Sequence, residues 1–485
     1  MGNAPATEVA PRNARHAIAQ LRRAVVVIQV PRSSERNAGR SVQLCRSASA
    51  GARPSTIGDM RTEASPPNVL TYAQASEVIR LHAAQISAAF QARQEETTLL
   101  DSRGRVLAAP IYADRDQPPF DRTTRDGFAC RAEEISRQPL RVVGLLRAGE
   151  EWLGTLASAE ALEIMTGAPV PSGADCVVMV EHTSNTGSGN GEVRLLDGRK
   201  IQSSENIVPR ASEAHRGTPL LPAGIRLAAQ HIALAASCGQ THLKVFRKPR
   251  VAVQATGDEL VEITETPLPF QIRNSNSYSL AAQVTQCGAE PLLLPILRDD
   301  CIETVAAITS ALAADADLII LSGGVSMGKF DFVEEALHKL GAEFLFTGAK
   351  IQPGKPVVFG RLPRPAGAWT YFFGLPGNPI STLVTFALFV HPLLNTLSGE
   401  IDAGPRFALA RLAADVSVKR GLTRFLPAIL QSAALAPGVT AIPWQGSGDM
   451  AANARANCYL VVPDQGESGS DSLKAGVIVS VLLIG

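Results

Sequence analysis

The sequence predicts a multidomain protein in which an α/β domain is combined with β-rich segments. The chain of 485 residues is too long for one ordinary core, so several domains are expected. Residues 249–397 alternate apolar strand-like runs with helical segments, which is typical of a doubly wound parallel sheet. Residues 110–209 and 404–485 contain short strand-like runs broken by glycine and proline. These indicate a β-rich domain and a small closed β-barrel-like domain.

The composition narrows the class of function. Apolar residues make up 45% of the chain and charged residues 19%, as in soluble globular proteins, and the net charge of +1 gives no sign of nucleic-acid binding. The apolar runs fall short of the roughly 18 residues that a membrane span needs, so we expect a cytoplasmic protein without a membrane partner. The cysteines are odd in number and lack C-x-x-C pairs, which predicts reduced thiols and no zinc site.

The N-terminal segment differs from the rest of the chain. Its first sixty positions hold nine arginines, no lysine and three acidic residues, and apolar patterning is poor. We therefore predict that residues 1–66 are a disordered basic extension, and Met60 is a candidate start of the folded protein. The short apolar run 24–30 is a meagre core for a signal peptide, and a short strand or a disordered stretch suits it better.

Two segments outside the α/β region have helical periodicity. Residues 72–86 space their apolar side chains for one helical face, with Thr71 as the expected N-cap, and helical character returns at 227–238.

Within the α/β region, three predicted strands end in polar or glycine-rich turns. These turns are TGDEL (256–260), RDD (298–300) and SGGVSMG (322–328). If the strands are parallel, all three turns lie at one edge of the sheet, where ligands bind in such folds. Bare amides at a strand-to-helix turn favour an anion such as phosphate, and carboxylates beside that anion require a hard cation such as Mg²⁺. Each turn alone is more often structural, but three together favour a phosphate ester and a metal.

Four further turns carry polar residues. Prolines stiffen PGKP (353–356) around Lys355 and GLPGNP (374–379) ahead of Ser381. Asn378 suits a helix cap as well as a ligand contact. DGFA (126–129) and MTGAPVP (165–171) place Asp126 and Thr166 in polar loops, and either loop alone suits a plain turn.

These motifs occur in an order that resembles the MoeA and gephyrin E-domain family of molybdopterin molybdenumtransferases, over roughly residues 68–485. The resemblance implies a helical linker domain (67–110 and 210–248), a β-rich domain (111–209), a molybdopterin-binding α/β domain (249–397) and a C-terminal β-barrel-like domain (398–485). It also implies a homodimer, in which Asp126 and Thr166 reach the α/β domain of the partner chain. Molybdopterin adenylyltransferase and apo-molybdoenzymes are implied as further partners.

The implied reaction is the insertion of molybdate into the dithiolene of adenylylated molybdopterin, with Mg²⁺-dependent hydrolysis and release of AMP. The residues implied in catalysis are Asp126, Thr166, Glu259, Asp299 and Asp331. The last three are the candidate metal ligands, and the sequence leaves open which of them binds the ion. The residues implied in binding molybdopterin or molybdate are Ser322, Gly323, Gly324, Ser326, Gly328, Lys355, Pro376, Gly377, Asn378, Pro379, Ser381, Arg424 and Ser447.

The sequence departs from the family pattern at Gln352, and two other functions are alternatives to the transferase. Gln352 stands where the family often has lysine, which removes one positive charge near a dianionic substrate. A molybdopterin adenylyltransferase would not need the β-rich and barrel domains, so DGFA and MTGAPVP count against that activity. A non-catalytic molybdopterin carrier or scaffold would tolerate the loss of the acidic residues at the strand ends, yet all of them are present.

Overall fold

The computed structural model describes residues 26–27, 68–91, 93–185, 191–324, 332–432, 437–466 and 470–484. The chain divides into two compact units. The first contains the segment that ends at Arg93 together with Phe246–Gly485, and the second is Gln94–Val245. The predicted boundaries between four domains are finer than this division and stay a prediction. The predicted basic extension, residues 1–66, lies outside the described residues except for Val26–Val27.

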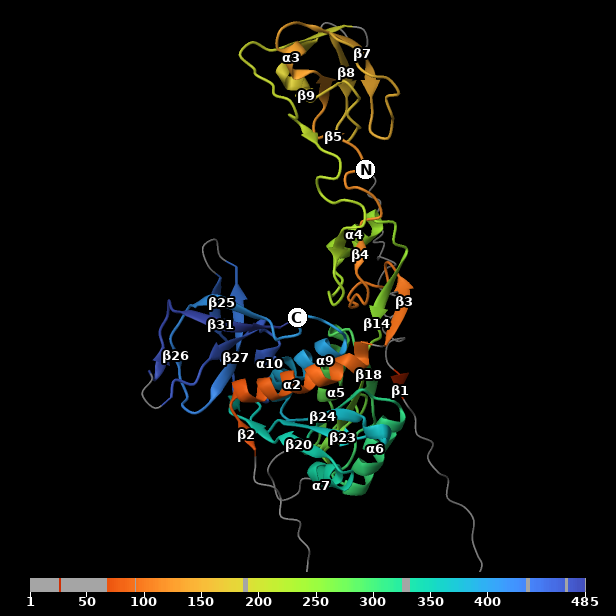
Figure 1. Cartoon of the computed structure of the whole chain (residues 1–485). Coiled ribbons are helices and arrows are strands. Elements are labelled where there is room, and N and C mark those ends of the chain that lie inside the picture. Colours follow the sequence, from red (N-terminus) through yellow and green to blue (C-terminus); the bar gives the residue numbers. More distant parts are fainter. Residues whose placement is uncertain are drawn as a thin grey trace, which may run out of the picture. The chain divides into compact units, whose positions relative to one another are not determined.

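A seven-stranded sheet forms the centre of the first unit, in the order β1-β18-β15-β19-β24-β23-β20 (Figure 1). The first five strands of that order are parallel. After β15 the chain forms β18 on one side of β15, and it then crosses to the other side of β15 to form β19. This reversal of strand order is the switch point at which doubly wound folds bind ligands. The strands are β1 (Val26–Val27), β15 (Arg250–Ala255), β18 (Glu290–Leu293), β19 (Leu318–Ser322), β20 (Glu343–Phe346), β23 (Val358–Pro363) and β24 (Trp369–Leu375).

The last two strands of the sheet, β23 and β20, are antiparallel to their neighbours. The predicted parallel sheet is therefore confirmed for five strands and does not extend to this edge. The five residues that separate β23 from β24 explain the difference, because a parallel crossover needs a dozen or more residues whereas a hairpin does not.

Helices cover both faces of this sheet, and alternate residues of β19 show it. Leu318 and Ile320 belong to the cluster formed with one group of helices, whereas Ile319 and Leu321 pack against the other group. On the first face lie α2 (Tyr72–Gln91), α5 (Asn276–Gln286), α8 (Pro379–Thr385), the π-helical turn η3 (Phe386–Val390) and α9 (His391–Leu397). On the second face lie α6 (Cys301–Ala313) and α7 (Phe332–Lys339).

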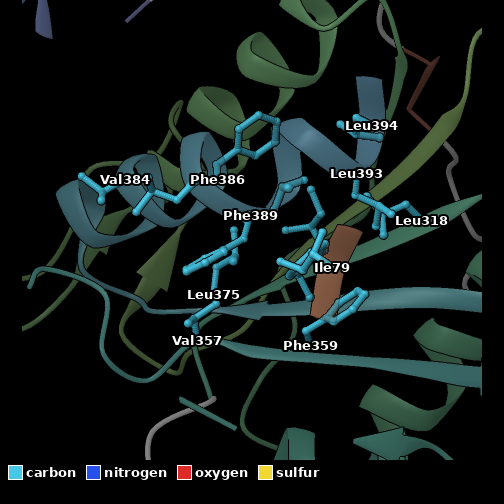
Figure 2. Packing of buried hydrophobic residues seen from close by; sticks show 14 of the residues in the cluster. Ile79, Leu318, Val357, Phe359, Leu375, Val384, Phe386, Phe389, Leu393 and Leu394 are labelled. Carbon is cyan, nitrogen blue, oxygen red and sulfur yellow. The ribbon is translucent and has the colours of Figure 1, made fainter. Parts of the chain in front are cut away.

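The larger of the two clusters packs buried aromatic and aliphatic side chains against one another (Figure 2). Phe359 and Phe373 stack with their ring centroids 4.7 Å apart, and Phe389 is fully buried above the sheet. Ile79 brings α2 into this cluster. The predicted N-cap of α2 is confirmed, because the amide of Gln74 donates to the Thr71 hydroxyl at 3.3 Å.

The segment from α8 to α9 forms a continuous helix of 19 residues, Pro379–Leu397. Its length and apolar composition suffice to cross a membrane, so the expectation that no apolar run reaches such a length is wrong here. However, 72% of its most apolar window is buried inside the protein. The segment is apolar because it packs on the sheet as a core helix.

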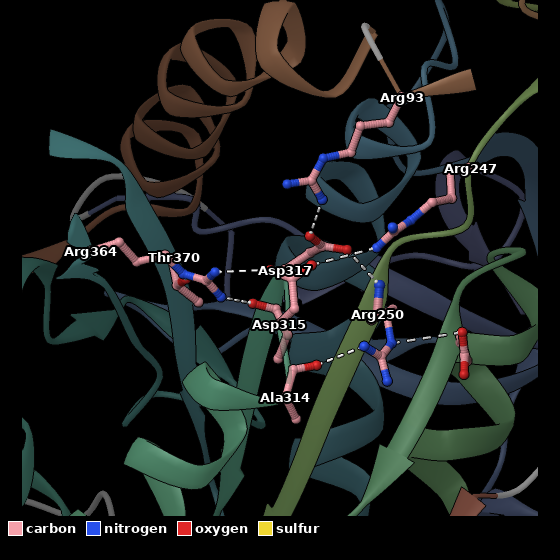
Figure 3. Close-up of polar contacts among 10 residues, drawn as sticks. Arg93, Arg247, Arg250, Ala314, Asp315, Asp317, Arg364 and Thr370 are labelled. Atoms are coloured by element: carbon pink, nitrogen blue, oxygen red, sulfur yellow. Dashed lines mark hydrogen bonds and ion pairs between the residues drawn. The ribbon is translucent and has the colours of Figure 1, made fainter. Parts of the chain in front are cut away.

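A network of arginines and carboxylates closes the amino ends of the central strands (Figure 3). Asp317, whose side chain is 4% exposed, accepts from Arg93 Nη1 at 2.7 Å and from the Arg250 amide at 2.8 Å. Arg364 bonds Asp315 and the Thr370 hydroxyl. The network thereby joins the first residues of β15 and β24 and the residues just before β19 to Arg93, which follows α2.

The C-terminal part of the first unit is a closed five-stranded barrel, as predicted. The strands pair in the order β27-β28-β25-β31-β29, and β29 returns to β27. Strand β22 joins the barrel from the α/β side and places Gln352 opposite Arg424. The elements are β22 (Ile351–Gln352), β25 (Phe407–Leu412), β27 (Thr423–Gln431), β28 (Gly438–Ala441), α10 (Met450–Asn453), β29 (Cys458–Val462) and β31 (Ile478–Leu483).

The second unit is rich in strands, as predicted. Its main sheet has the order β10-β11-β7-β8-β6-β9, and the helix α4 (Ala229–Ser237) confirms the helical segment expected at 227–238. The sheet consists of β6 (Gly127–Cys130), β7 (Leu140–Leu146), β8 (Glu160–Ile164), β9 (Cys176–Met179), β10 (Thr183–Asn185) and β11 (Glu192–Leu195). Shorter pairs join β3 (Gln94–Thr98) to β14 (His242–Phe246), β4 (Ile111–Tyr112) to β13 (Pro219–Leu221), and β5 (Arg122–Thr123) to β12 (Ile207–Val208).

The cysteines that the structure describes are buried free thiols, as the sequence predicted. They are Cys130, Cys176, Cys238, Cys287, Cys301 and Cys458.

Candidate functional site

A cavity of about 480 Å³ opens at the carboxyl ends of β15, β18 and β19. The three turns predicted to share one edge of the sheet meet there. Gly257 and Glu259 follow β15, Asp299 follows β18, and Ser322–Gly324 ends β19. The GLPGNP turn forms another wall through Pro376, Gly377, Asn378 and Pro379. The cavity therefore combines glycine turns and carboxylates at the switch point of the sheet.

The glycines of the SGGVSMG turn are required by close backbone approach. A Cβ atom on Gly323 would lie 2.3 Å from the carbonyl oxygen of Thr256, and the φ of Gly323 is +96°. Only glycine adopts this conformation without strain, and the amide of Gly323 itself donates to the Leu375 carbonyl oxygen at 3.2 Å. Gly323 Cα lies 3.8 Å from the position of a Cβ on Gly377, so the two glycine turns face one another.

The acidic residues of the cavity influence each other's charge. Burial raises the pKa of Asp299, and the neighbouring carboxylates Asp258 and Glu259 raise it further. Gly257 allows this crowding, because a Cβ atom there would lie 2.6 Å from the Glu259 carboxylate. Carboxylate oxygens are the protein donors that Mg²⁺ prefers.

Some of the predicted site residues lie outside the described part of the chain, namely Ser326, Gly328 and the third acidic residue, Asp331. Among the residues described, no three histidine, cysteine, aspartate or glutamate side chains gather closely enough to hold a metal on their own. Glu259 and Asp299 are thus the described members of the predicted metal set, and the role of Asp331 stays a prediction.

A second group of predicted residues gathers where the barrel meets the α/β domain. The backbone amide of Ile380 donates to the carbonyl oxygen of Ser447 at 3.0 Å, which joins the QGSGD loop to the start of α8. A Cβ on Gly354 would lie 3.6 Å from the carbonyl oxygen of Ser381, so the PGKP loop also borders α8. Lys355 is exposed and Ser381 is 4% exposed. None of the four residues implied in molybdate binding here, Lys355, Ser381, Arg424 and Ser447, lines the 480 Å³ cavity.

Arg424 and Gln352 are paired residues of β27 and β22, and each has a buried polar side-chain atom without a hydrogen-bond partner. Arg424 Nη1 donates to the Ser417 carbonyl at 2.9 Å, whereas its Nε is buried without a partner. Gln352 Oε1 is also buried without a partner. Burial lowers the pKa of the Arg424 guanidinium. Buried polar atoms are rarely left unpaired, so a bound oxyanion fits the donor at this position.

In the second unit, the structure brings together Asp126 and Thr166, which are 40 residues apart. The backbone amide and the hydroxyl of Thr166 both donate to Asp126 Oδ1, at 2.6 and 2.7 Å. These two hydrogen bonds, that of the amide first, hold the pKa of Asp126 below its ordinary value. Gly127 begins β6 directly after the carboxylate, and a Cβ atom there would collide with the Val178 carbonyl.

Sequence reasoning missed several residues that line the cavity. They include Thr256, Arg273, Asn274, Ser275, Asn276 and Pro356. The polar run NSNS before an apolar helical pattern was the available signal, but such a run more often caps a helix than contacts a ligand.

Comparisons with known proteins match almost the whole described chain. A family described as "MoeA N-terminal region (domain I and II)" matches residues 70–239, "Probable molybdopterin binding domain" matches 252–396, and "MoeA C-terminal region (domain IV)" matches 409–484.

Proteins named molybdopterin molybdenumtransferase are clear relatives. The one from Bacillus subtilis is 35% identical over 400 residues, which cover 81% of this chain and 90% of the relative. The one from Nostoc sp. is 40% identical over 315 residues, which cover 63% of this chain and 70% of the relative.

The fold has solved counterparts. Two crystal structures of the molybdopterin biosynthesis MoeA protein from Pyrococcus horikoshii align with TM-scores of 0.63 and 0.68, at 31% and 25% identity. Each alignment covers 86% of this chain, and 99% or more of the solved chain. The chain therefore belongs to the MoeA family of molybdopterin molybdenumtransferases, which are transferases of molybdenum cofactor biosynthesis.

Proposed function

We propose that this protein inserts molybdenum into molybdopterin, with adenylylated molybdopterin and molybdate as substrates and AMP as a product. The observation that carries the proposal is the meeting of glycine turns with Glu259 and Asp299 in one cavity at the switch point of the sheet. A substrate with a diphosphate needs anion-binding amides and charge neutralisation side by side, and both elements are present there.

The glycine turns are the proposed diphosphate site. Gly323 and Gly377 approach one another in the cavity wall, and neither carries a side chain that would cover the backbone there. Backbone amides in such turns bind phosphate oxygens without bringing a counter-charge of their own. Bound there, the phosphoanhydride lies beside the carboxylates of Glu259 and Asp299.

Those carboxylates are the proposed Mg²⁺ ligands, together with Asp331. The raised pKa of Asp299 supports this assignment, because a crowded carboxylate next to a second one gains most from a bound cation. When bound, Mg²⁺ would neutralise the diphosphate and polarise the phosphorus that is attacked. Glu259, Asp299 and Asp331 would hold the ion beside the glycine turns.

Asp126 is the proposed group that orients the attacking water or the metal, from the partner chain of a homodimer. Asp126 is ionised at neutral pH, as an ordinary aspartate is, and its lowered pKa extends that charge to more acidic pH, so it can accept a hydrogen bond from water. Thr166 fixes the direction of the carboxylate through two hydrogen bonds to one oxygen and leaves the other oxygen for this role.

Molybdate is the proposed ligand where the barrel meets the α/β domain. A tetrahedral dianion needs several donors, preferably charged ones. Arg424 offers a guanidinium whose buried Nε has no partner, Lys355 and Ser447 belong to neighbouring loops, and Ser381 lies in the first turn of α8. We also propose a cytoplasmic location, with a molybdopterin adenylyltransferase and apo-molybdoenzymes as partners.

AMP release by the purified protein tests this function. Adenylylated molybdopterin is supplied with Mg²⁺, with and without molybdate, and AMP is quantified by chromatography. We expect release that depends on molybdate. Tight binding without turnover would identify a carrier, and synthesis of adenylylated molybdopterin from ATP would identify an adenylyltransferase.

A further inference from the structure

Asn276, the first residue of α5, joins the two glycine turns of the cavity. Its side-chain Nδ2 donates to Ser322 Oγ at 2.9 Å and to the Gly377 carbonyl oxygen at 2.8 Å. Ser322 ends β19 and begins the SGGVSMG turn, whereas Gly377 belongs to GLPGNP. One amide group thus ties together two loops that both line the cavity.

The chemistry of this contact fixes the direction of the Ser322 hydroxyl. An asparagine NH₂ group has two hydrogens, and both are used here. Ser322 Oγ is the acceptor, so its own hydrogen points away from Asn276. Within the described part of the chain that hydroxyl donates to no acceptor, and Ser322 lines the cavity. The hydroxyl is therefore held as a donor for an anion in the cavity.

Capping of α5 does not require Asn276. The N-terminus of that helix is closed by Asn274, whose Oδ1 accepts from the Ser277 amide at 3.1 Å and whose Nδ2 donates to the Ser277 hydroxyl at 2.9 Å. The Asn276 side chain points instead across to β19 and to the turn before α8, and its Oδ1 is buried without a partner.

We infer that Asn276 is a positioning residue, which sets the spacing of the two phosphate-binding turns and aims the Ser322 hydroxyl at a phosphate oxygen of the bound substrate. The inference rests on the proposed function for the identity of that substrate. The geometry itself suits any anion that contacts both turns, such as the diphosphate of a nucleotide-linked pterin.

Substitutions at Asn276 separate positioning from a general structural role. Asn276→Asp keeps the shape of the side chain but replaces the donating NH₂ group with a carboxylate oxygen. That oxygen would face the Gly377 carbonyl oxygen, so the hydrogen bond between them is lost. The Ser322 hydroxyl would then turn to donate to the aspartate and away from the ligand. Asn276→Ala leaves both turns without the tie. Ser279→Ala is the matched control. Ser279 lies one turn after Asn276 in α5, its hydroxyl donates to the Asn276 backbone carbonyl, and it does not line the cavity.

The test measures AMP release and, separately, ADP binding by calorimetry. We expect each Asn276 variant to lower kcat/KM and ADP affinity by roughly ten- to a hundredfold, the range for a misplaced charge-assisted donor. Ser322→Ala should cost about as much as Asn276→Ala, and the double variant should cost little more than either one. Melting temperature should stay close to that of the Ser279→Ala control.

Two outcomes would overturn the inference. Unchanged ADP affinity in Asn276→Ala would show that the tie does not position the turns. Additive losses in the double variant, accompanied by a lower melting temperature, would show a general structural role. If the wild-type protein binds ADP and Asn276→Asp does not, but no AMP is ever released, the inference stands and the proposed reaction fails.

Discussion

Thr166 donates two hydrogen bonds to a single oxygen of Asp126, one from its backbone amide at 2.6 Å and one from its hydroxyl at 2.7 Å. The two residues come from separate motifs, and the pairing of β6 with β8 brings the loops together. Both hydrogen bonds lower the pKa of Asp126 by stabilising its charged form. The pair therefore presents an ionised carboxylate of fixed direction on the surface of the second unit.

Loss of the Thr166 hydroxyl should shift the acid limb of activity. Thr166→Val keeps the amide donor but removes the second hydrogen bond, so the pKa of Asp126 rises towards its ordinary value of 3.8. We expect the acid limb of the kcat/KM profile to move to higher pH. Thr166→Ser should restore the wild-type limb. Thr124→Val is the control, because that exposed hydroxyl bonds the Asn206 carbonyl instead.

Replacement of the carboxylate itself should have a larger effect. Asp126→Asn removes the charge that orients water or metal, and we expect AMP release to fall by roughly 10²- to 10⁴-fold, the usual contribution of such a group. The circular dichroism spectrum and melting temperature should change little, since Asp126 is exposed. An AMP release rate within twofold of wild type (about 0.4 kcal/mol in barrier) would remove Asp126 from the mechanism.

Binding of Mg²⁺ should depend on pH through Asp299. Because the folded-state pKa of Asp299 is raised above 3.8, its proton competes with the cation up to a higher pH than for an ordinary aspartate. Apparent Mg²⁺ affinity, measured by calorimetry with ADP present, should rise with pH through that raised pKa and then level off. Without the metal, the same shift makes the protein lose stability as pH rises from the ordinary to the raised pKa.

Glu259→Gln checks the cause of this pH dependence. Removing the neighbouring charge should lower the pKa of Asp299, so the rise in affinity moves to lower pH while the plateau affinity falls. Glu265→Gln, on the exposed loop after β16 (Leu260–Val261), should change neither. An affinity that is independent of pH in the wild-type protein would exclude Asp299 as a ligand.

Much of the α/β domain was predictable, because apolar strands and polar turns alternate strictly there. The turns after β15, β18 and β19 meet as expected, since parallel strands bring their carboxyl ends to one edge. The tie made by Asn276 was not predictable. Gly377 lies 101 residues further along the chain, and nothing local distinguishes this asparagine from a helix cap. The same limit applies to β23, where the length of the connection, not the apolar pattern, decides the strand direction.

Restoring a positive charge at position 352 should strengthen oxyanion binding. Gln352 stands opposite Arg424, and the two side chains have a buried unpaired acceptor and donor. Gln352→Lys adds a charged donor beside the Arg424 guanidinium, and we expect roughly tenfold lower apparent KM for molybdate. Gln352→Met, of similar size and without polar atoms, is the control. If Gln352→Lys lowered the apparent KM for molybdate less than that for tungstate, the gain would not come from charge attraction, which is the same for both dianions.

The network at the amino ends of the strands should matter for stability only. Asp317 is buried and pairs with Arg93, while burial raises its pKa and the Arg250 amide and Arg93 partly offset that rise. Asp317→Asn weakens the hydrogen bonds that the carboxylate accepts from Arg93 and from the Arg250 amide, and we expect a loss of about 2 kcal/mol in the free energy of unfolding by urea. Glu290→Gln, at the looser contact with Arg250 of 3.9 Å, should cost less than about 1 kcal/mol. Equal losses would contradict this ranking.

The most direct test of the central claim is a joint count of AMP released and molybdenum acquired by the pterin. After a single turnover with adenylylated molybdopterin, Mg²⁺ and molybdate, the pterin is recovered and its molybdenum is measured by mass spectrometry. We expect equal amounts of AMP and pterin-bound molybdenum, and neither product from a variant with Glu259→Gln and Asp299→Asn combined. AMP release without molybdenum on the pterin, or undiminished transfer by that variant, would contradict it.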